Sequence, residues 1–256
     1  MIAIDLSGKT ALVTGATGQL GRVMARTLAQ SGANLILHYF RNQEQASLLQ
    51  QELQQLGRSV FIVQADIGNM DDVVQMKHTL STNFVMPDIV VGNAVSQYEW
   101  TSILEQNMQD YIDQFQTTVL QAVHLAKVFV PHMIEQRYGR MIGINTECAM
   151  QNGPTQSAYV AGKRGMDGIY RILAKEIGEH QITVNQVAPG WTLSERDLGI
   201  DPSERQDSGY IRQVPLQRRG TDQEIANVVV FLASDLASYI TGAYIPVTGG
   251  NVMPTI

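Results

Sequence analysis

A tyrosine and a lysine four residues apart are the first residues in this sequence whose spacing suggests chemistry. On a helix, Tyr159 and Lys163 would share one face. A phenol has a pKa of about 10 and exchanges protons poorly at neutral pH, but a neighbouring ammonium favours the phenolate. Upstream, Thr146 follows a predicted strand and carries a hydroxyl that could polarise a carbonyl. Taken alone, the pair is as easily explained by a packed tyrosine and a solvated lysine.

Glycines at intervals of three form a second candidate site. Gly15, Gly18 and Gly21 lie between a short apolar run and a helical pattern. The first suits a tight turn, the second lets backbone approach a pyrophosphate, and the third lets the helix pack closely on the strand. The helix N-terminus would add N–H donors and the positive end of its dipole. The motif predicts dinucleotide binding, with an ordinary glycine turn as the alternative.

The end of the second predicted strand bears on which dinucleotide binds. A site for NAD usually has an acid there for the adenosine ribose, whereas an arginine suits a 2′-phosphate. This end holds Tyr39, Arg41 and Asn42, with no acid before Glu44. We therefore expect NADP(H), with NAD(H) as the second possibility and an arginine that only caps a surface turn as the structural alternative. Asp66, after the third predicted strand, could bind adenine or begin a helix.

Seven short apolar runs alternate with longer segments of helical periodicity. The runs are Thr10–Thr14, Asn34–Tyr39, Ser59–Gln64, Asp88–Val91, Arg140–Asn145, Thr183–Val187 and Ala243–Val247. Apolar strands separated by helix-length spacers predict a parallel sheet covered by helices on both faces. We expect one α/β domain over residues 1–256, with a doubly wound sheet of about seven strands. Ligands of such sheets bind outside the carboxyl ends of the strands.

Composition excludes several classes of protein. The chain has 256 residues, 44% hydrophobic and 16% charged, which argues against a disordered chain. Its one cysteine cannot form an internal disulfide, which excludes a disulfide-stapled scaffold. A formal net charge of −6 disfavours nucleic acid as a partner. The longest apolar run, Val228–Ala233, is far shorter than the ~20 residues that cross a bilayer. With no signal peptide evident, we expect a cytoplasmic protein without membrane partners.

With the glycine turn, the Tyr159–Lys163 pair and Thr146, the sequence resembles the short-chain dehydrogenase/reductase family over essentially the whole chain. Later motifs agree with the family in their order. The matching segments are Asn185–Gly190, Pro215–Thr221, Glu224–Ala226, Thr241–Gly242 and Val247–Gly250. Within the family, the sequence is most similar to the 3-oxoacyl-(acyl carrier protein) reductase type.

The resemblance implies a Rossmann-type fold and hydride transfer between nicotinamide and a ketone, an aldehyde or a secondary alcohol. Tyr159 would be the general acid in reduction and the general base in oxidation. Lys163 would hold the nicotinamide ribose and lower the pKa of Tyr159, and Thr146 would bind the substrate oxygen. Thr118 aligns with the fourth member of the family's catalytic set. The residues expected to bind the cofactor are Gly15, Thr17, Gly18, Gln19, Leu20, Gly21, Tyr39, Arg41, Asn42, Asp66, Ile67, Asn93, Ala94, Tyr159, Lys163, Pro189, Gly190 and Thr192.

The resemblance also implies an assembly. The family forms homotetramers or homodimers through the helices that here contain Thr118 and Tyr159, and through the C-terminal strand. The apolar segment Val119–Val130 is consistent with such an interface and equally with core packing.

Four positions depart from the family's pattern. Two residues, rather than three, separate Gly15 from Gly18. Thr146 stands where a serine is usual, and its β-methyl restricts χ1. Val95 puts bulk near the cofactor, and Thr118 lacks the amide of the family's asparagine. These changes leave a second hypothesis open: a weak or inactive dinucleotide-binding sensor on the same fold.

Several other residues have two readings. The long polar segment from Trp191 to Val214 suits a mobile substrate lid. Trp100 and Trp191 flank the presumed cleft, where they could contact substrate or pack. Cys148 is expected to be a small buried side chain rather than a nucleophile, since no partner base is evident. The five histidines are scattered without the spacing of metal ligands, so no metal site is predicted.

Overall fold

One parallel sheet organises the chain. The computed structural model describes residues 4–194, 197, 199–200 and 207–254. Its seven strands lie in the order β3-β2-β1-β4-β5-β6-β9, and all neighbouring pairs are parallel. The strands are β1 (Thr10–Val13), β2 (Asn34–Tyr39), β3 (Val60–Gln64), β4 (Ile89–Gly92), β5 (Gly139–Ile144), β6 (Ile182–Pro189) and β9 (Tyr244–Val247). All seven predicted strands are therefore confirmed, with small differences at their ends.

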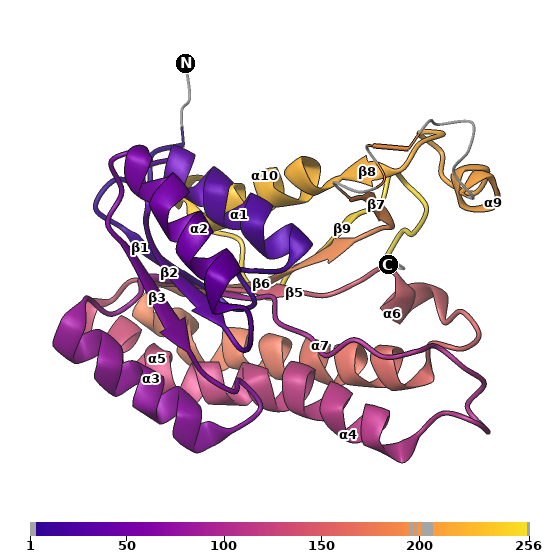
Figure 1. The fold of residues 1–256 in the computed structure, drawn as a ribbon, viewed down its shortest axis with the longest axis horizontal. Coiled ribbons are helices and arrows are strands. Elements are labelled where there is room, and N and C mark those ends of the chain that lie inside the picture. The colour runs from indigo at the N-terminus through magenta and orange to yellow at the C-terminus, as the bar shows by residue number, and fades with distance from the viewer. Residues whose placement is uncertain (1–3, 195–196, 198, 201–206, 255–256) are drawn as a thin grey trace.

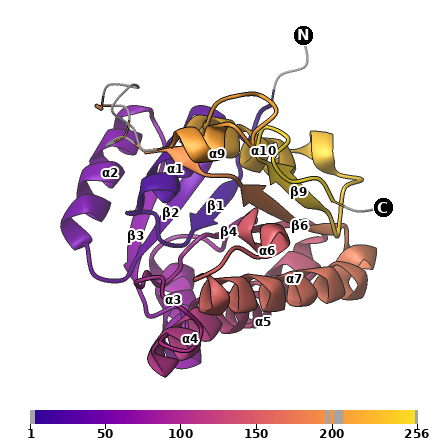
Figure 2. The same cartoon turned by 90° about the vertical axis from the view of Figure 1, so that its right-hand side faces the viewer.

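Helices cover both faces of this sheet (Figures 1 and 2). One face carries α1 (Gln19–Gln30), α2 (Gln43–Gln55) and α10 (Asp222–Ala233). The other carries α3 (Met70–Asn83), α4 (Met108–Phe115), α5 (Gln121–Gln136) and α7 (Ser157–Ile177). Each face has its own buried core, with Met24, Leu49 and Val229 in one and Phe129 and Tyr170 in the other. The predicted doubly wound α/β domain is confirmed.

The helix starts differ in a way that matters for ligand binding. Asn42, Asn69 and Asn107 cap α2, α3 and α4 by accepting hydrogen bonds from backbone N–H groups, and Thr221 caps α10. At the start of α1, Gly18 offers no side chain, and no side-chain cap is present. The first N–H groups of α1 therefore have no side-chain acceptor and are available to a ligand.

The winding of the chain reverses between β1 and β4, the two strands that meet at the centre of the sheet. Asn93, just after β4, ties the two carboxyl ends together. Its backbone N–H donates to Thr14 Oγ1 over 2.8 Å, and its side-chain amide donates to the Thr14 carbonyl over 2.9 Å. The crevice outside this reversal is where doubly wound sheets bind ligands.

Several short elements complete the fold, and none of them was predicted. A π-helix, η1 (Gln116–Leu120), joins α4 to α5, and β7 (Thr192–Leu193) pairs with β8 (Gly220–Thr221). The remaining ones are α6 (Cys148–Gln151), α9 (Ser208–Ile211) and the 3₁₀ turns η2 (Gly178–His180) and η4 (Asp235–Ala237). Of the predicted lid, 191–214, residues 195–196, 198 and 201–206 lie outside the described residues. Among the described helices, none is long and apolar enough to cross a membrane.

Candidate active site

The glycine turn has the geometry that a bound pyrophosphate requires. Gly15 has φ +61°, a conformation that favours glycine. A Cβ on Gly21 would lie 2.3 Å from the Gly15 carbonyl oxygen, so α1 approaches the turn too closely for any side chain there. Gly18, at the uncapped helix start, is exposed. The residues present fit a dinucleotide whose phosphates bind backbone N–H groups.

A buried histidine, His38 in β2, is hydrogen-bonded to this turn. The Gly15 N–H donates to His38 Nδ1 over 3.0 Å, and His38 Nε2 lies 3.0 Å from the Ala65 carbonyl oxygen. Burial lowers the pKa of His38 to about 4, so the ring is neutral at pH 7. A neutral ring that accepts at Nδ1 carries its proton on Nε2, which can then donate to Ala65. His38 therefore joins the glycine turn to the segment after β3.

The residues predicted to bind the adenosine end divide into exposed and structural groups. Arg41 is exposed, with its guanidinium carbon 4.8 Å from the centre of the Phe40 ring. Asn42 caps α2, and Asp66 Oδ1 accepts from the Gly68 N–H over 2.9 Å. These two side chains have local partners in the fold. Tyr39 and Ile67 are buried, and Ala94 donates its N–H to Thr14 Oγ1.

Side chains in the turn are directed to neighbouring parts of the fold. Gln19 Nε2 donates to Asp222 Oδ2 over 2.7 Å, which holds this side chain against α10. Leu20 packs on the core of that face of the sheet. The Thr17 carbonyl accepts from Arg22 Nη1 over 2.9 Å. This arrangement leaves the backbone of the turn as the surface that a pyrophosphate would meet.

Tyr159 and Lys163 lie one turn apart on α7, and burial changes the pKa of both side chains. It raises the pKa of Tyr159 to about 12, against a hydrogen bond from Thr146 that lowers it. Burial lowers the pKa of Lys163 to about 8. Lys163 Nζ donates to the Ile144 carbonyl over 2.6 Å and lies 5.7 Å from the centre of the Tyr159 ring. Burial is the largest influence on the pKa of Tyr159, and the Thr146 hydroxyl is the group that opposes it.

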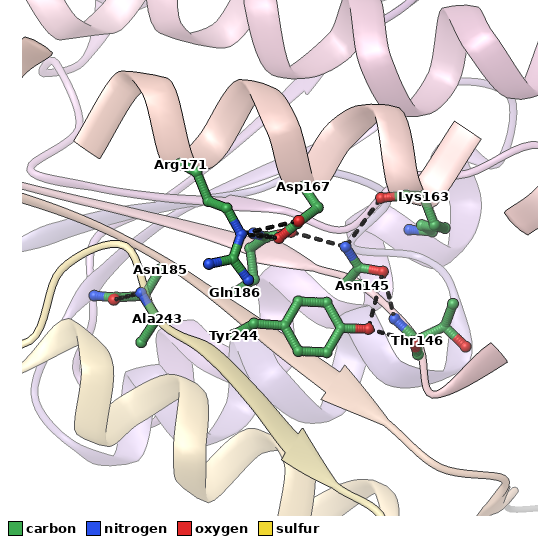
Figure 3. A network of polar contacts seen from close by, with 9 residues as sticks. All are labelled: Asn145, Thr146, Lys163, Asp167, Arg171, Asn185, Gln186, Ala243 and Tyr244. Carbon is green, nitrogen blue, oxygen red and sulfur yellow. Dashed lines mark hydrogen bonds and ion pairs between the residues drawn. The ribbon is translucent and has the colours of Figure 1, made fainter. Parts of the chain in front are cut away.

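Asn145, just after β5, is hydrogen-bonded to the backbone of both Lys163 and Thr146 (Figure 3). Its amide donates to the Lys163 carbonyl over 3.1 Å and to Gln186 Oε1 over 2.7 Å. Its Oδ1 accepts from the Thr146 N–H over 2.9 Å, and the Tyr244 hydroxyl donates to the Thr146 carbonyl. Both the N–H and the carbonyl of Thr146 are therefore held by side-chain hydrogen bonds.

The same network continues to the protein surface. Gln186 Nε2 donates to Asp167 Oδ1 over 2.8 Å, and Arg171 Nε donates to the same oxygen over 2.9 Å (Figure 3). Asn145 and Gln186 are buried, whereas Arg171 is exposed. Their amides satisfy one another, so the polar groups cost little to bury and restrict movement of the catalytic segment.

Thr118 is buried in the π-helix and uses its hydroxyl locally. Its Oγ1 donates to the Gln114 carbonyl over 2.5 Å. A Cβ on Gly162 would lie 2.5 Å from Thr118 Oγ1. Thr118 therefore packs against the turn of α7 that joins Tyr159 to Lys163. Its place in the fold is beside the catalytic helix, and its hydroxyl already has an acceptor.

A cavity of about 600 Å³ opens at the carboxyl edge of the sheet. Thr146 and Tyr159 line it together with Gly190, Thr192 and both tryptophans that sequence analysis singled out. Pro189 ends β6 next to it, and its carbonyl accepts from the Glu147 N–H. Cys148 also lines the cavity, and burial raises the pKa of its thiol, as expected for a residue that is not a nucleophile. Of the four predicted catalytic residues, Thr146 and Tyr159 therefore line this cavity, whereas Lys163 and Thr118 are not among its lining residues.

Two aromatic side chains orient Tyr159, and one of them was missed by sequence reasoning. The Tyr98 hydroxyl accepts the Tyr159 backbone N–H over 2.8 Å. The Trp100 ring stacks on the Tyr159 ring, with centres 5.9 Å apart and planes at 29°. The only signal for Tyr98 in the sequence is its position two residues before Trp100, in the loop after the fourth strand. Across the described residues, no group of three or more His, Cys, Asp and Glu side chains could hold a metal ion.

Comparisons with known proteins agree with this geometry. A family model described as enoyl-(acyl carrier protein) reductase matches residues 15–251. The chain is 34% identical to the 3-oxoacyl-[acyl-carrier-protein] reductase FabG of Escherichia coli K12, covering 98% of this chain and 100% of that one. Its identity to FabG of Staphylococcus epidermidis is also 34%, covering 96% and 99%. Nodulation protein G of a Rhizobium strain is 33% identical, covering 97% and 99%.

A solved structure is similar over the whole length. It is the crystal structure of a proposed gluconate dehydrogenase from Agrobacterium tumefaciens, with a TM-score of 0.91 and 27% identity, covering 99% of this chain and 100% of that one. The chain belongs to the short-chain dehydrogenase/reductase family. It is accordingly an oxidoreductase that uses NAD(P)(H) and transfers a hydride between nicotinamide and a carbonyl or alcohol carbon.

Proposed function

We propose that this protein is an NADPH-dependent reductase of ketones or aldehydes, with Tyr159 as the general acid. The observation that carries the proposal is the cavity that Tyr159 and Thr146 line together, with Lys163 buried one turn farther along the helix that carries Tyr159. A sensor that only binds dinucleotide would not need a phenol and a hydroxyl facing one substrate-sized space. The altered residues Val95 and Thr118 lie outside the lining of that cavity.

The chain's own residues would position the substrate and the dinucleotide and would donate one proton. When bound, the nicotinamide supplies the hydride. Because the pKa of Tyr159 is about 12, its phenol carries a proton at neutral pH and can donate it to the oxygen of the reduced carbonyl. Thr146, held by Asn145, would orient that oxygen from the other side. Lys163, buried and with a pKa of about 8, would donate to the ribose hydroxyls.

NADPH is favoured over NADH by the residues that follow β2. Arg41 is exposed there, at the place where an adenosine ribose would lie. We expect NADPH to raise the melting temperature more than NADH at equal concentration, because binding to the native state stabilises it. Arg41→Ala should remove most of the difference between the two dinucleotides, whereas Arg58→Ala, at the far end of β3, should leave it unchanged.

Tyr159→Phe tests the catalytic assignment. Removing the hydroxyl should lower kcat with any ketone substrate by roughly 10²- to 10⁴-fold, the usual contribution of a general acid. Dinucleotide affinity, measured by fluorescence titration, should change less than twofold. Tyr239→Phe is the matched control, since this side chain is fully exposed. Unchanged turnover in Tyr159→Phe would overturn the proposal.

We also propose that the protein works in the cytoplasm as a homotetramer or homodimer. An apolar surface on α4 supports an assembly: Met108, Ile112 and Phe115 are 69%, 46% and 51% exposed, although their side chains are large and hydrophobic. Exposed apolar side chains gathered on one face are typical of surfaces that bind protein. The single cysteine, which forms no disulfide, is in keeping with a reducing compartment.

A further inference from the structure

The cavity around Tyr159 has aromatic walls. Trp100 lies on one side, stacked on the Tyr159 ring. Trp191 lies among the lining residues with its ring edge-on to Tyr210, at 5.5 Å between centres and 73° between planes. Both indoles remain about half exposed, at 45% and 48%. Flat ring faces are therefore left to cover the C–H groups of a small substrate.

The described lining of this cavity carries negative charge and no positive charge. Among the described residues that line it, Glu147 is the single charged side chain, and the other polar groups are amides, hydroxyls and a thiol. A nearby cation, Arg219, lies 4.1 Å from the Trp191 ring, but its guanidinium already binds Asp197 and Asp207. The described lining thus offers no cation to a carboxylate or phosphate, and Glu147 would repel one.

Two buried acceptors on the lining bear on the kind of ligand that the cavity takes. Glu147 is buried, and Asn251 Nδ2 donates to its Oε2 over 3.0 Å. Burial raises the pKa of this carboxyl, against hydrogen bonds from Tyr210, Asn251 and the Trp191 backbone that lower it. A carboxylate has about four acceptor sites, so those three neighbours leave about one for a ligand. Gln156 Oε1, on the same lining, is buried and has no partner.

Unpaired buried acceptors are costly, so a ligand that brings hydroxyl donors gains more than one that does not. We propose that this cavity takes an uncharged ketone or aldehyde rich in hydroxyl groups, and that Glu147 selects it by accepting hydrogen bonds from those hydroxyls. The inference rests on the proposed reductase function. Glu147 lines the same cavity as Thr146 and Tyr159, so a ketone whose carbonyl is held by those two residues has this carboxylate within the same enclosed space.

The test compares ketones of equal carbon skeleton. Erythrulose and xylulose carry hydroxyls, whereas 2-butanone and 2-pentanone do not. With NADPH, we expect kcat/KM for the hydroxylated ketones to exceed that for their counterparts by roughly 100-fold or more, because sites built to bind a hydroxyl reject analogues that lack it. Acetoacetate, an anionic ketone, should be a poorer substrate than erythrulose because Glu147 would repel it, and aminoacetone, a cationic ketone, is measured beside it.

Glu147→Gln should lower kcat/KM for erythrulose roughly 10-fold or more, mainly through KM, and change that for 2-butanone less than threefold. Gln156→Met should also lower kcat/KM for erythrulose, by a smaller factor. This second variant tests the inference if Glu147→Gln does not fold. Glu176→Gln, on the exposed side of α7, is the matched control and should change neither value. A variant counts only if its melting temperature and dinucleotide affinity stay close to those of the parent.

A readout without turnover separates this inference from the proposed function. With NADP⁺ bound, erythrulose should raise the melting temperature more than 2-butanone, and Glu147→Gln should remove the difference. Reduction of 2-butanone as efficient as that of erythrulose would overturn the inference while leaving a reductase. A preference for acetoacetate or aminoacetone would also overturn it. Erythrulose binding without turnover of any ketone would support the cavity assignment and contradict the reductase.

Discussion

Buried ionisable side chains near the site take protonation states that burial sets. His38 is neutral, and Tyr159 keeps its proton to a pKa of about 12. Lys163 loses its proton more readily than a solvated lysine, with a pKa of about 8. Such shifts are typical of functional sites, where burial and nearby groups tune side chains toward a chemical role. For His38 the role is to hold the glycine turn, and this makes the fold sensitive to acid.

The pKa of His38 falls from 6.5 to about 4 on folding, so the folded protein binds this proton less well than the unfolded chain does. Its contribution to stability is complete above pH 6.5 and is lost as the pH falls toward 4. At about 1.4 kcal/mol per pKa unit, the loss is about 3 kcal/mol. We expect the free energy of unfolding, from urea titrations at several pH values, to fall over this window in the parent.

His38→Gln provides the comparison, because glutamine can accept and donate but does not titrate. The variant should be less stable than the parent at pH 7, and the difference should shrink as the pH falls from 6.5 to 4. The other four histidines and all carboxylates are present in both proteins, so their contributions cancel in the difference between the two free energies of unfolding. A difference that stays constant over this range would contradict the assigned role of His38.

At the level of elements, α7 packs closely against the π-helix at the turn between Tyr159 and Lys163. Gly162, between Tyr159 and Lys163, leaves room for Thr118 and the Gln114 carbonyl, at 2.5 and 3.2 Å from the position of a Cβ. The helix therefore lies close to its neighbour at the turn that presents the catalytic pair. Farther along α7, Gly168 has open space where a side chain would be.

These two glycines make a matched pair on one helix. Gly162→Ala should lower the free energy of unfolding by about 1–3 kcal/mol, because the new methyl overpacks a closed contact. Gly168→Ala should raise it by about 0.5–1 kcal/mol, because alanine favours a helix interior over glycine. Urea denaturation of both variants measures this. Equal effects of the two substitutions would show that the contact with Thr118 is not closed in solution.

The sequence predicts the sheet well because buried parallel strands are apolar on both faces and leave a clear pattern. It also predicts Tyr159, Lys163, Thr146 and the glycines, whose types and spacing are themselves the signal. The roles of other site residues depend on contacts between distant segments: Tyr98 reaches Tyr159 across 61 positions and Glu147 reaches Asn251 across 104. Periodicity carries no information on such contacts. The π-helix has no mark in the sequence either.

At the scale of the whole molecule, the exposed face of α4 is the feature that an isolated subunit does not explain. Met108, Ile112 and Phe115 are spaced four and three residues apart, so they share one side of the helix. In the loop that precedes α4, Ile103 and Leu104 are also large, hydrophobic and exposed. Covering such a surface with a second subunit would remove it from water.

The double variant Ile112→Lys, Phe115→Lys should therefore give a smaller species than the parent in sedimentation velocity at about micromolar concentration, since lysines would have to be buried unpaired at the interface. Leu48→Lys is the control, because Leu48 is an equally exposed apolar residue on α2, on the opposite face of the sheet. The prediction fails if the parent itself sediments as a monomer, or if the control dissociates as readily.

Arg219 is buried and links three separate parts of the chain through its guanidinium. Its guanidinium donates to Asp197 over 2.8 Å and to Asp207 over 3.2 Å, and it also binds the Thr192 carbonyl. One side chain thus joins Asp197 to Asp207 and to the Thr192 carbonyl in β7, much as a crosslink would. Replacing Arg219 would therefore release both carboxylates and the Thr192 carbonyl in a single step, beside the strand pair of β7 and β8.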